Sequence, residues 1–487
     1  MDFVHALIGL LKQWYWIPIL FVYLGVIITI LTENRDPEKT VAWVLVIVFL
    51  PILGLVVYYI FGQKFKKERS FRRKNSYEHQ RLLASWKRIK PLMDENMEVL
   101  AARIGPLSRV FEFLYKEHIS SVTLRNRVKL LINGEEKFPA LLSALRGARH
   151  HIHLEYYIFE QDDIGTEILA ILKQKVTEGV QIRLIIDDFG SSSFKKTVDM
   201  FRREGVEMLR FLPVNFTSLA DSNYRNHRKV AIIDGDTAFV GGINISDRYN
   251  NNGKYPLYWR DTSVKIEGFA VNVLQIWFWM DWLFANGPMF DLGEGYLNSS
   301  DKEYGDMAVT FAYSDPGSKA AYNMEAMLLA ISQAKKSLKL CTPYFIPSDQ
   351  LTTALQLAAS SGVEVELMMP AKGDSFVVQH ASFSFLKPLL ERGVKVYLYQ
   401  KGFIHAKTIS IDGQMAFIGT VNLDTRSFYI NFEISAIVQD EQLCQRLDTQ
   451  FSLDREQSVL LTLEGWKHRP VITRGFDSLC RLLAPLL

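Results

Sequence analysis

One pattern occurs twice in this chain of 487 residues: a histidine, a lysine two positions later, and an aspartate five positions after the lysine. An asparagine follows each copy, and every matching residue recurs 178 positions further along the chain. A duplication of this kind predicts two similar structural halves that pack against each other. The repeated residues are His227, Lys229, Asp234 and Asn244 in the first copy, and His405, Lys407, Asp412 and Asn422 in the second.

Each copy has the local signature of a β-strand followed by a tight turn. Histidine and lysine are two residues apart, so in an extended strand they project from the same face. The apolar, β-prone residues that follow fit a strand, and the Asp-Gly pairs at 234–235 and 412–413 predict turns. Asp234 and Asp412 lie an odd number of residues from their histidine and lysine, so in an extended strand they would project from the other face. This favours a turn or scaffold role for them. A single copy could be only a hairpin with a polar edge, but two matching copies make that interpretation weak.

Two facing copies have a clear use in phosphodiester chemistry. One imidazole can attack phosphorus while the other protonates the departing alkoxide. The two ammonium groups can hold the non-bridging oxygens, where negative charge accumulates. A histidine in such a role usually needs a carboxylate that orients its ring. Asp261 and Glu433, which lie at equivalent places in strand-like runs, are the candidates for this role.

The motifs and their flanks resemble the bacterial cardiolipin synthases of the phospholipase D superfamily. The superfamily signature is the paired H-x-K-x4-D motif, and the resemblance covers essentially the whole chain. The flanks that carry it are the segments 223–229, 241–247, 342–347 and 419–428. The resemblance implies an α/β fold with two similar α/β/α sandwich halves about a pseudo-twofold axis and both motifs in a shared cleft.

The resemblance also implies an activity, namely transphosphatidylation. One phosphatidylglycerol would phosphatidylate a histidine and release glycerol, and a second phosphatidylglycerol would displace that histidine to give cardiolipin. His227 is then the expected nucleophile and His405 the acid and base. Lys229, Lys407, Asn244, Asn422 and Thr420 are the expected phosphate contacts. The first copy departs from the pattern, because Gly242 stands where the second copy has Thr420.

No cofactor or metal is expected. One phosphodiester is exchanged for another, so the reaction requires no external energy source, and the sequence has no Walker-type loop for a nucleotide. His150, His151 and His153 could suggest a metal site, but they open an apolar strand and lack clustered cysteine or carboxylate ligands. The net charge of +3 gives no case for nucleic-acid binding. The three cysteines have no metal-like spacing and are expected to be reduced packing residues.

The N-terminus predicts a membrane anchor. Two runs without charged residues, Trp14–Leu31 and Val41–Phe61, are separated by a polar stretch and predict a transmembrane helical hairpin. A basic cluster at 64–74 follows the second run. The positive-inside rule then places both termini and the catalytic halves in the cytoplasm, on a multi-pass protein of the bacterial inner membrane. The partners expected are phosphatidylglycerol and the bilayer, where the basic cluster would sit on anionic headgroups.

The expected organisation is an anchor (1–63), a basic and helical linker (64–120), a first half (121–300) and a second half (301–487). Strands alternate with helices in both halves, which predicts a mixed, mostly parallel sheet with helices on both faces. The aromatic run 276–284 could face lipid but is better explained as core.

The C-terminal apolar helix face leaves two alternatives open. This face (Phe476, Leu479, Cys480, Leu482, Leu483, Leu486, Leu487) could dock on the protein body or insert into a membrane interface.

Two rival functions remain at this stage. The first is a membrane-anchored phospholipase D-type hydrolase of phosphodiesters, in which water resolves the intermediate. The second is a non-catalytic lipid-binding scaffold, which the two intact motifs disfavour.

Overall fold

The protein is described from a computed structural model. It covers residues 14, 16–32, 37–58, 95–196, 198–214, 223–293, 295–298 and 302–484. The predicted basic cluster at 64–74, most of the linker and the boundary between residues 300 and 301 lie outside this described part of the chain.

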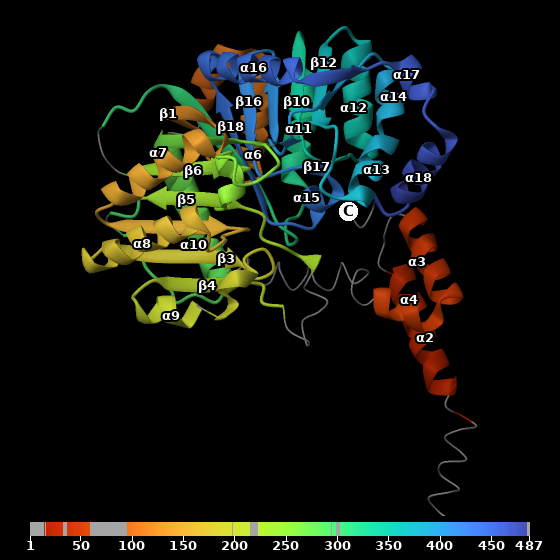
Figure 1. Cartoon of the computed structure of the whole chain (residues 1–487), viewed down its shortest axis with the longest axis horizontal. Coiled ribbons are helices and arrows are strands. Elements are labelled where there is room, and N and C mark those ends of the chain that lie inside the picture. Colours follow the sequence, from red (N-terminus) through yellow and green to blue (C-terminus); the bar gives the residue numbers. More distant parts are fainter. Residues whose placement is uncertain are drawn as a thin grey trace, which may run out of the picture.

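The centre of the fold is one fifteen-stranded mixed sheet (Figure 1). Its strands in the first half are β1 (Thr123–Ile132), β2 (His151–Tyr156), β3 (Gln181–Asp187), β4 (Glu207–Phe211), β5 (Lys229–Ile233), β6 (Thr237–Gly241) and β8 (Thr262–Gly268). In the second half they are β9 (Met307–Ser314), β10 (Ser337–Cys341), β12 (Glu364–Pro370), β13 (Lys395–Tyr399), β15 (Thr408–Ile411), β16 (Met415–Gly419), β18 (Glu433–Gln439) and β19 (Ser458–Leu461).

The strand order repeats between the halves. It runs β4-β3-β2-β5-β6-β8-β1 in the first half and β13-β12-β10-β15-β16-β18-β9 in the second, with β19 added at the outer edge. β9 pairs with both β18 and β1, so the two halves form one continuous sheet. Figure 1 shows the first half, coloured orange to green, beside the second half in teal to blue.

The prediction of a mostly parallel sheet is wrong. Among the described strands, the parallel pairs of the sheet are β2–β3, β3–β4, β10–β12 and β12–β13, and its other pairs are antiparallel. Part of the cause lies in the motifs themselves. Asp234 and Asp412 adopt left-handed conformations with φ of 52° and 54°, and each starts a tight turn that folds β5 onto β6 and β15 onto β16.

The helices cover both faces of the sheet. They are α7 (Asn133–Gly147), α8 (Asp163–Thr177), α9 (Val198–Arg203), α10 (Ala270–Phe284), α11 (Tyr322–Gln333), α12 (Asp349–Ser360), α13 (Phe376–Ser384), α14 (Leu386–Leu390), α15 (Thr425–Tyr429), α16 (Glu441–Glu456), α17 (Leu463–Lys467) and α18 (Val471–Arg481). In β5, Ile232 packs in the same core as Phe278 of α10, whereas its neighbour Ile233 packs in the core that holds Leu141 of α7 and Ile168 of α8. Adjacent strand residues thus serve opposite faces.

Side-chain caps fix where several of these helices begin. Asp162 accepts a hydrogen bond from the backbone N–H of Gly165 at the start of α8, and Ser348 does the same for Leu351 at α12. Asp440 accepts from Leu443 N at the start of α16. Each cap satisfies a backbone donor that the helix itself leaves unpaired.

The described end of the linker belongs to the core. A helix over 95–104 leads through a 3₁₀ turn, Gly105–Leu107, to α6 (Ser108–Lys116). Leu100, Val110, Phe111 and Leu114 are fully buried in the main hydrophobic core. The aromatic run 276–284 is also core, as predicted, because Phe278 and Trp282 on α10 are buried.

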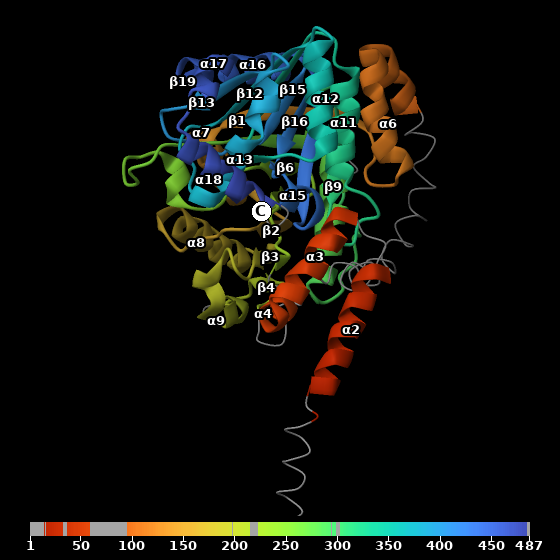
Figure 2. The same ribbon diagram turned by 90° about the vertical axis from the view of Figure 1, so that its right-hand side faces the viewer.

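The two N-terminal apolar runs form three helices, α2 (Trp16–Thr32), α3 (Pro37–Phe49) and α4 (Pro51–Val57). Ile30 of α2 and Ile47 of α3 share a small apolar cluster. The second run is divided because Leu50 leaves helical geometry ahead of Pro51. No helix of the described residues is both long and apolar enough to cross a membrane, so the predicted transmembrane hairpin is not confirmed by them. Figures 1 and 2 show these helices, in red, extending away from the sheet.

A buried arginine joins the two halves. Arg228 of the first half pairs with Asp281 on α10 at 2.5 Å and donates to the Ser314 carbonyl of β9 at 3.1 Å. Its guanidinium also lies 3.4 Å from the ring centroid of Tyr313. Burial lowers the pKa of Arg228, but Asp281 and its other anionic neighbours outweigh this effect and raise it. Arg228 therefore carries a charge that the surrounding anions hold in the core.

Replacement of Arg228 with leucine should lower the free energy of unfolding by about 3–5 kcal/mol, because Asp281 would remain buried without its cation. Urea denaturation of the detergent-solubilised protein measures this. Arg127→Leu is the matched control. Arg127 pairs with Glu267 at the surface, so its loss should cost less than about 1 kcal/mol. Equal effects of the two substitutions would contradict the assignment of Arg228 as an internal tie.

Candidate active site

The histidine of the first motif is held by the second half of the chain. His227 lies just before β5, and its backbone N–H donates to the carbonyl of Phe432 at 3.0 Å. Its Nδ1 lies 2.9 Å from Oε1 of Glu433, the first residue of β18. Glu433 is completely buried, whereas the His227 side chain is 13% exposed. A first-half imidazole is thus oriented by a second-half carboxylate.

The second motif makes the reciprocal contact. The backbone N–H of His405 donates to the Arg260 carbonyl at 2.7 Å, and Nδ1 of His405 lies 2.7 Å from Oδ2 of Asp261. Short parallel pairings between the halves bring these residues together. β14 (Phe403–Ile404) pairs with β7 (Trp259–Arg260), and Asn226 forms the equivalent bridge to Phe432. Both carboxylates predicted from the sequence therefore contact a histidine, each in the opposite half.

The two motif lysines are buried beside the histidines. Lys229 Nζ donates to the carbonyl of His227 at 2.6 Å, and Lys407 Nζ donates to that of His405. Burial lowers the pKa of both lysines, while Glu433 and Asp261 raise it. Each lysine also lowers the pKa of the other motif's histidine, because the charges of both lysines lie near both imidazoles.

Burial also sets the protonation of the histidines. It lowers the pKa of His227, and Glu433 opposes the effect. For His405, burial and Lys407 lower the pKa to about 3, against the opposing charge of Asp261. Burial raises the pKa of Asp261 and Glu433, but the adjacent cations outweigh it and hold both values below the usual range. An anionic phosphate in the site would raise the pKa of both imidazoles.

The motif aspartates have a structural role. Asp234 accepts hydrogen bonds from the backbone N–H groups of Arg149, His150 and His151 at 2.8–3.0 Å. Asp412 accepts from Lys335, Lys336 and Ser337 at 2.7–2.9 Å. Each aspartate thus ties its turn to the start of the neighbouring strand, β2 or β10. This geometry agrees with the scaffold role inferred from their position on the strand face opposite to the histidine and lysine.

The difference between Gly242 and Thr420 has a spatial reason. A Cβ atom at Gly242 would lie 2.2 Å from Oδ1 of Asp261, so glycine leaves the space that this carboxylate occupies. In the second half, the Thr420 hydroxyl donates to Oε2 of Glu433 and accepts from Ile434 N at 3.0 Å. The hydroxyl that we expected to contact phosphate is therefore bonded to the carboxylate that orients His227.

The two motif asparagines also differ. Asn244 is tied to its own half, since its Oδ1 accepts from Ile158 N at 3.1 Å and its Nδ2 donates to the Tyr249 hydroxyl at 2.9 Å. Asn422 is 5% exposed, and its Oδ1 has no hydrogen-bond partner within the described part of the chain.

Among the described residues, more aromatic rings lie close to His405 than to His227. The rings of Trp259, Phe403 and Tyr249 lie 5.5–6.1 Å from His405, measured between ring centroids. His227 has Tyr157 at 5.0 Å.

A further lysine in this region was missed by the sequence analysis. Lys137 of α7 donates to the Ile243 carbonyl at 2.5 Å. Burial lowers its pKa to about 7, while Asp261 acts to raise it. A single lysine in a helix gives no sequence signal for such a position.

The histidine-rich start of β2 is packed as aromatic core. His151 and His153 both contact Gln275 of α10, and the His153 ring stacks on Phe278 at 4.4 Å. Burial lowers the pKa of both rings, to about 4 for His151. Within the residues that the structure describes, no group of three or more His, Cys, Asp or Glu is placed to hold a metal ion.

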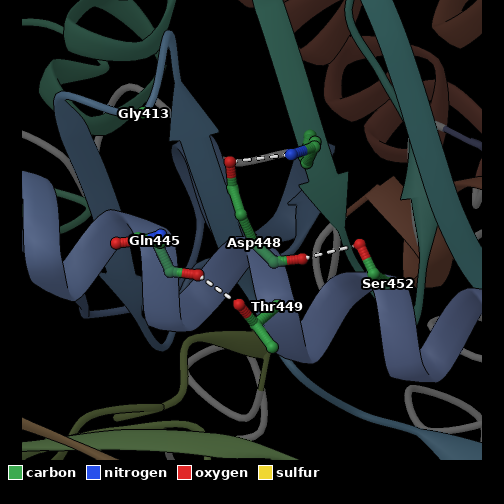
Figure 3. Close-up of a pocket in the computed structure, with 6 residues that line it drawn as sticks. Gly413, Gln445, Asp448, Thr449 and Ser452 are labelled. Carbon is green, nitrogen blue, oxygen red and sulfur yellow. Dashed lines mark hydrogen bonds and ion pairs between the residues drawn. The ribbon is translucent and has the colours of Figure 1, made fainter.

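The pocket in Figure 3 is separate from the motif histidines. It has a volume of about 310 Å³ and lies between α16, β10 and the turn at Gly413. Its polar groups bond to each other: Lys339 pairs with Asp448 at 2.7 Å, and the Ser452 hydroxyl donates to the Asp448 carbonyl at 3.0 Å. None of its lining residues belongs to the site described above.

The fold and the paired motifs define an enzyme of the phospholipase D-like class, and comparison with known proteins places it more narrowly. Residues 141–267 and 327–455 match the family described as "Cardiolipin synthase, PLD-like domain", and residues 21–63 match "Phospholipase D-nuclease N-terminal". Cardiolipin synthase of Alkalihalophilus pseudofirmus is 38% identical over 99% of this chain and 94% of its own length. Cardiolipin synthase 2 of Bacillus anthracis is 38% identical over 94% of this chain and 88% of its own length.

A solved structure supports the fold alone. Phosphatidylserine synthase of Haemophilus influenzae aligns with a TM-score of 0.60 at 15% identity, over 78% of this chain and all of the other. The chain belongs to the cardiolipin synthase family of the phospholipase D superfamily.

Gly242→Ala should disable the site, because the added methyl group would displace the Asp261 carboxylate from His405. Turnover should fall by about 100-fold, in the range that general acid–base catalysis contributes. Gly147→Ala is the matched control, since a Cβ there meets open space. The measurement is phosphatidyl transfer in detergent, with circular dichroism to confirm folding. Full activity of a folded Gly242→Ala protein would contradict the proposed fit between Gly242 and Asp261.

Proposed function

We propose that this protein makes cardiolipin by transferring the phosphatidyl group of one phosphatidylglycerol to the glycerol headgroup of another, with release of glycerol. The observation that carries the proposal is the pair of reciprocal contacts His227–Glu433 and His405–Asp261, with Lys229 and Lys407 buried beside the histidines. The names of the curated relatives agree with this activity.

The first step forms a covalent intermediate. Glu433 holds Nδ1 of His227, which leaves Nε2 as the nitrogen that attacks phosphorus. The phosphorus–nitrogen bond forms as the bond to the glycerol oxygen breaks, and His405 donates the proton that this oxygen takes up. Asp261 stabilises the charged form of His405 that this donation requires.

The second step reverses these roles with a new alcohol. A glycerol hydroxyl of the second phosphatidylglycerol gives its proton to His405 and attacks phosphorus. The bond to His227 breaks, and cardiolipin leaves. One phosphodiester replaces another, so the proposed exchange needs no cofactor.

Lys229 and Lys407 are the proposed ligands of the non-bridging phosphate oxygens. Asn422 and Asn244 are proposed as further contacts on the two sides, each through its side-chain N–H₂ group, because phosphate oxygens accept hydrogen bonds. For Thr420 we propose a supporting role, because its hydroxyl is already bonded to Glu433.

We also propose that the N-terminal segment anchors the protein in the bacterial inner membrane, with the catalytic halves on the cytoplasmic side. The match of residues 21–63 to a phospholipase D-nuclease N-terminal family supports a distinct N-terminal unit. The charge asymmetry around the two apolar runs supports the orientation.

Purified protein in phosphatidylglycerol liposomes, without metal or nucleotide, should form cardiolipin and glycerol in equal amounts. His227→Ala and His405→Ala should each abolish both products, since each step needs both imidazoles. Lipid chromatography with a glycerol assay measures this. Phosphatidic acid as the main product would mean that water is the acceptor and that the protein is a hydrolase.

The two orienting carboxylates should affect opposite limbs of the pH profile of kcat. Asp261→Asn removes a charge that raises the pKa of His405. The acid should then lose its proton at lower pH, and the alkaline limb should move down by about one pH unit. Glu433→Gln lowers the pKa of His227 in the same way. The nucleophile should then stay neutral to lower pH, so the acidic limb should move down. If Asp261→Asn instead moved the acidic limb and Glu433→Gln moved the alkaline limb, His405 would be the nucleophile and His227 the acid.

A further inference from the structure

The C-terminal helix α18 docks on the protein through its polar side. Asp477 and Cys480 are its buried residues, with exposures of 5% and 6%. Asp477 accepts from Nδ1 of His380 on α13 at 2.7 Å and also pairs with Arg469. Cys480 packs in a small cluster with Ile346 and Ala381. The helix is therefore fixed to α13 by an ion-paired carboxylate and by the apolar cluster around Cys480.

The apolar side of α18 faces outward. Ile472, Phe476, Leu479 and Leu483, which are four, three and four residues apart, lie on one helical face with exposures of 76%, 46%, 61% and 44%. Val471 and Leu482 extend it, at 73% and 75%. A helix on a protein surface normally buries its apolar stripe against the core. α18 instead buries its polar side, so its apolar stripe is exposed and free to contact another surface.

The same surface continues onto α13. Phe376 on α13 is 60% exposed, and its ring centroid lies 6.0 Å from that of Phe476. The positive charges of α18 lie on its other side: Arg474 and Arg481 are exposed and, by helical spacing, stand roughly opposite the apolar stripe, whereas Asp477 is buried in its ion pairs. An amphipathic helix with an apolar stripe and a basic polar side matches a bilayer that contains anionic lipid better than it matches an acidic or purely apolar protein surface.

A short series of contacts connects α18 and α13, which we call the rim, to the candidate active site. The Ser382 hydroxyl of α13 accepts from Phe345 N in β11 (Phe345–Ile346), and β11 pairs with β17 (Leu423–Asp424), the strand that follows Asn422. Tyr344 bonds to Asp374 just before α13, and its ring faces Phe403 beside His405. In Figures 1 and 2, α2–α4 extend downward from about the level of α18.

We propose that the exposed face of α18, together with Phe376, inserts into the interface of an anionic phospholipid bilayer and holds the rim of the active site at the headgroups. This inference rests on the proposed function, since the substrate would be phosphatidylglycerol taken from that bilayer. The occupant is thus a lipid surface. A second copy of the chain or another protein on this face is the competing outcome.

Contact with lipid can be measured without any turnover. Leu479→Cys in the full-length protein, labelled with an environment-sensitive fluorophore, should be quenched by lipids brominated on the acyl chains in phosphatidylglycerol vesicles. The matched control is Leu460→Cys on β19, where Leu460 is 48% exposed on a different element. Quenching at 479 and not at 460 supports the proposal. Equal quenching at both positions, or none at 479, overturns it.

The functional consequence is tested with three substitutions to serine at Ile472, Phe476 and Leu479. Cardiolipin formation in phosphatidylglycerol liposomes should fall by about tenfold or more, because the rim is no longer held at the interface. In mixed detergent micelles the same variant should keep most of the wild-type rate. Leu453, Val459 and Leu460 changed together to serine form the control, since these residues are similarly exposed. Their liposome rate should stay at the wild-type level.

The outcomes separate this proposal from the proposed function. If wild-type protein forms no cardiolipin in either liposomes or micelles while position 479 is still quenched, the proposed function fails and membrane docking stands. If the wild type is active and the α18 variant retains its liposome rate, docking is wrong. If the label at 479 is shielded without lipid and the variant changes the mass of the particle in light scattering, the face binds a second copy and the proposal is overturned.

Discussion

The candidate site depends on an exchange of carboxylates between two halves of one chain. Glu433 of the second half orients His227 of the first, and Asp261 of the first half orients His405 of the second. Neither motif histidine is paired with a carboxylate of its own half. The parallel pairing of β14 with β7 and the matching bridge at Asn226 fix this exchange in the backbone. Because the sheet is continuous through β9 and β1, the two imidazoles are placed relative to each other by the whole core.

The duplication is not symmetric in detail, and the differences concentrate around the histidines. Asp261, the shorter carboxylate, occupies the space that Gly242 leaves open. Glu433, the longer one, accepts a hydrogen bond from the hydroxyl of Thr420. His405 lies among aromatic rings and has its pKa lowered to about 3, first of all by burial. Two chemically different sides suit a reaction in which one imidazole bonds to phosphorus and the other moves protons.

The sequence singled out the motif residues and the two carboxylates that the structure places against the motif histidines, because a repeated spacing and a charge within an apolar strand are local signals. It could not show which histidine each carboxylate serves. The two pairs join residues 206 and 144 positions apart, and the pairing is set by how the halves pack. The sheet was predicted as mostly parallel because helices clearly alternate with the strands β2, β3 and β4. The antiparallel strands β5, β6 and β8 follow one another without such helices, so this alternation gives no signal for them. Likewise, the pattern of α18 defines an apolar face, but only the contact of Asp477 with His380 shows that this face points outward.

The central claim is that His227 forms a covalent bond to phosphorus while His405 moves the protons, so that each cardiolipin arises from two displacements at one phosphorus atom. The most direct test is the stereochemical course at phosphorus, measured with phosphatidylglycerol that carries a chiral phosphorothioate of known configuration. Two in-line displacements predict cardiolipin with retained configuration. Inverted configuration would mean a single direct displacement, with no covalent histidine intermediate, and would contradict the account.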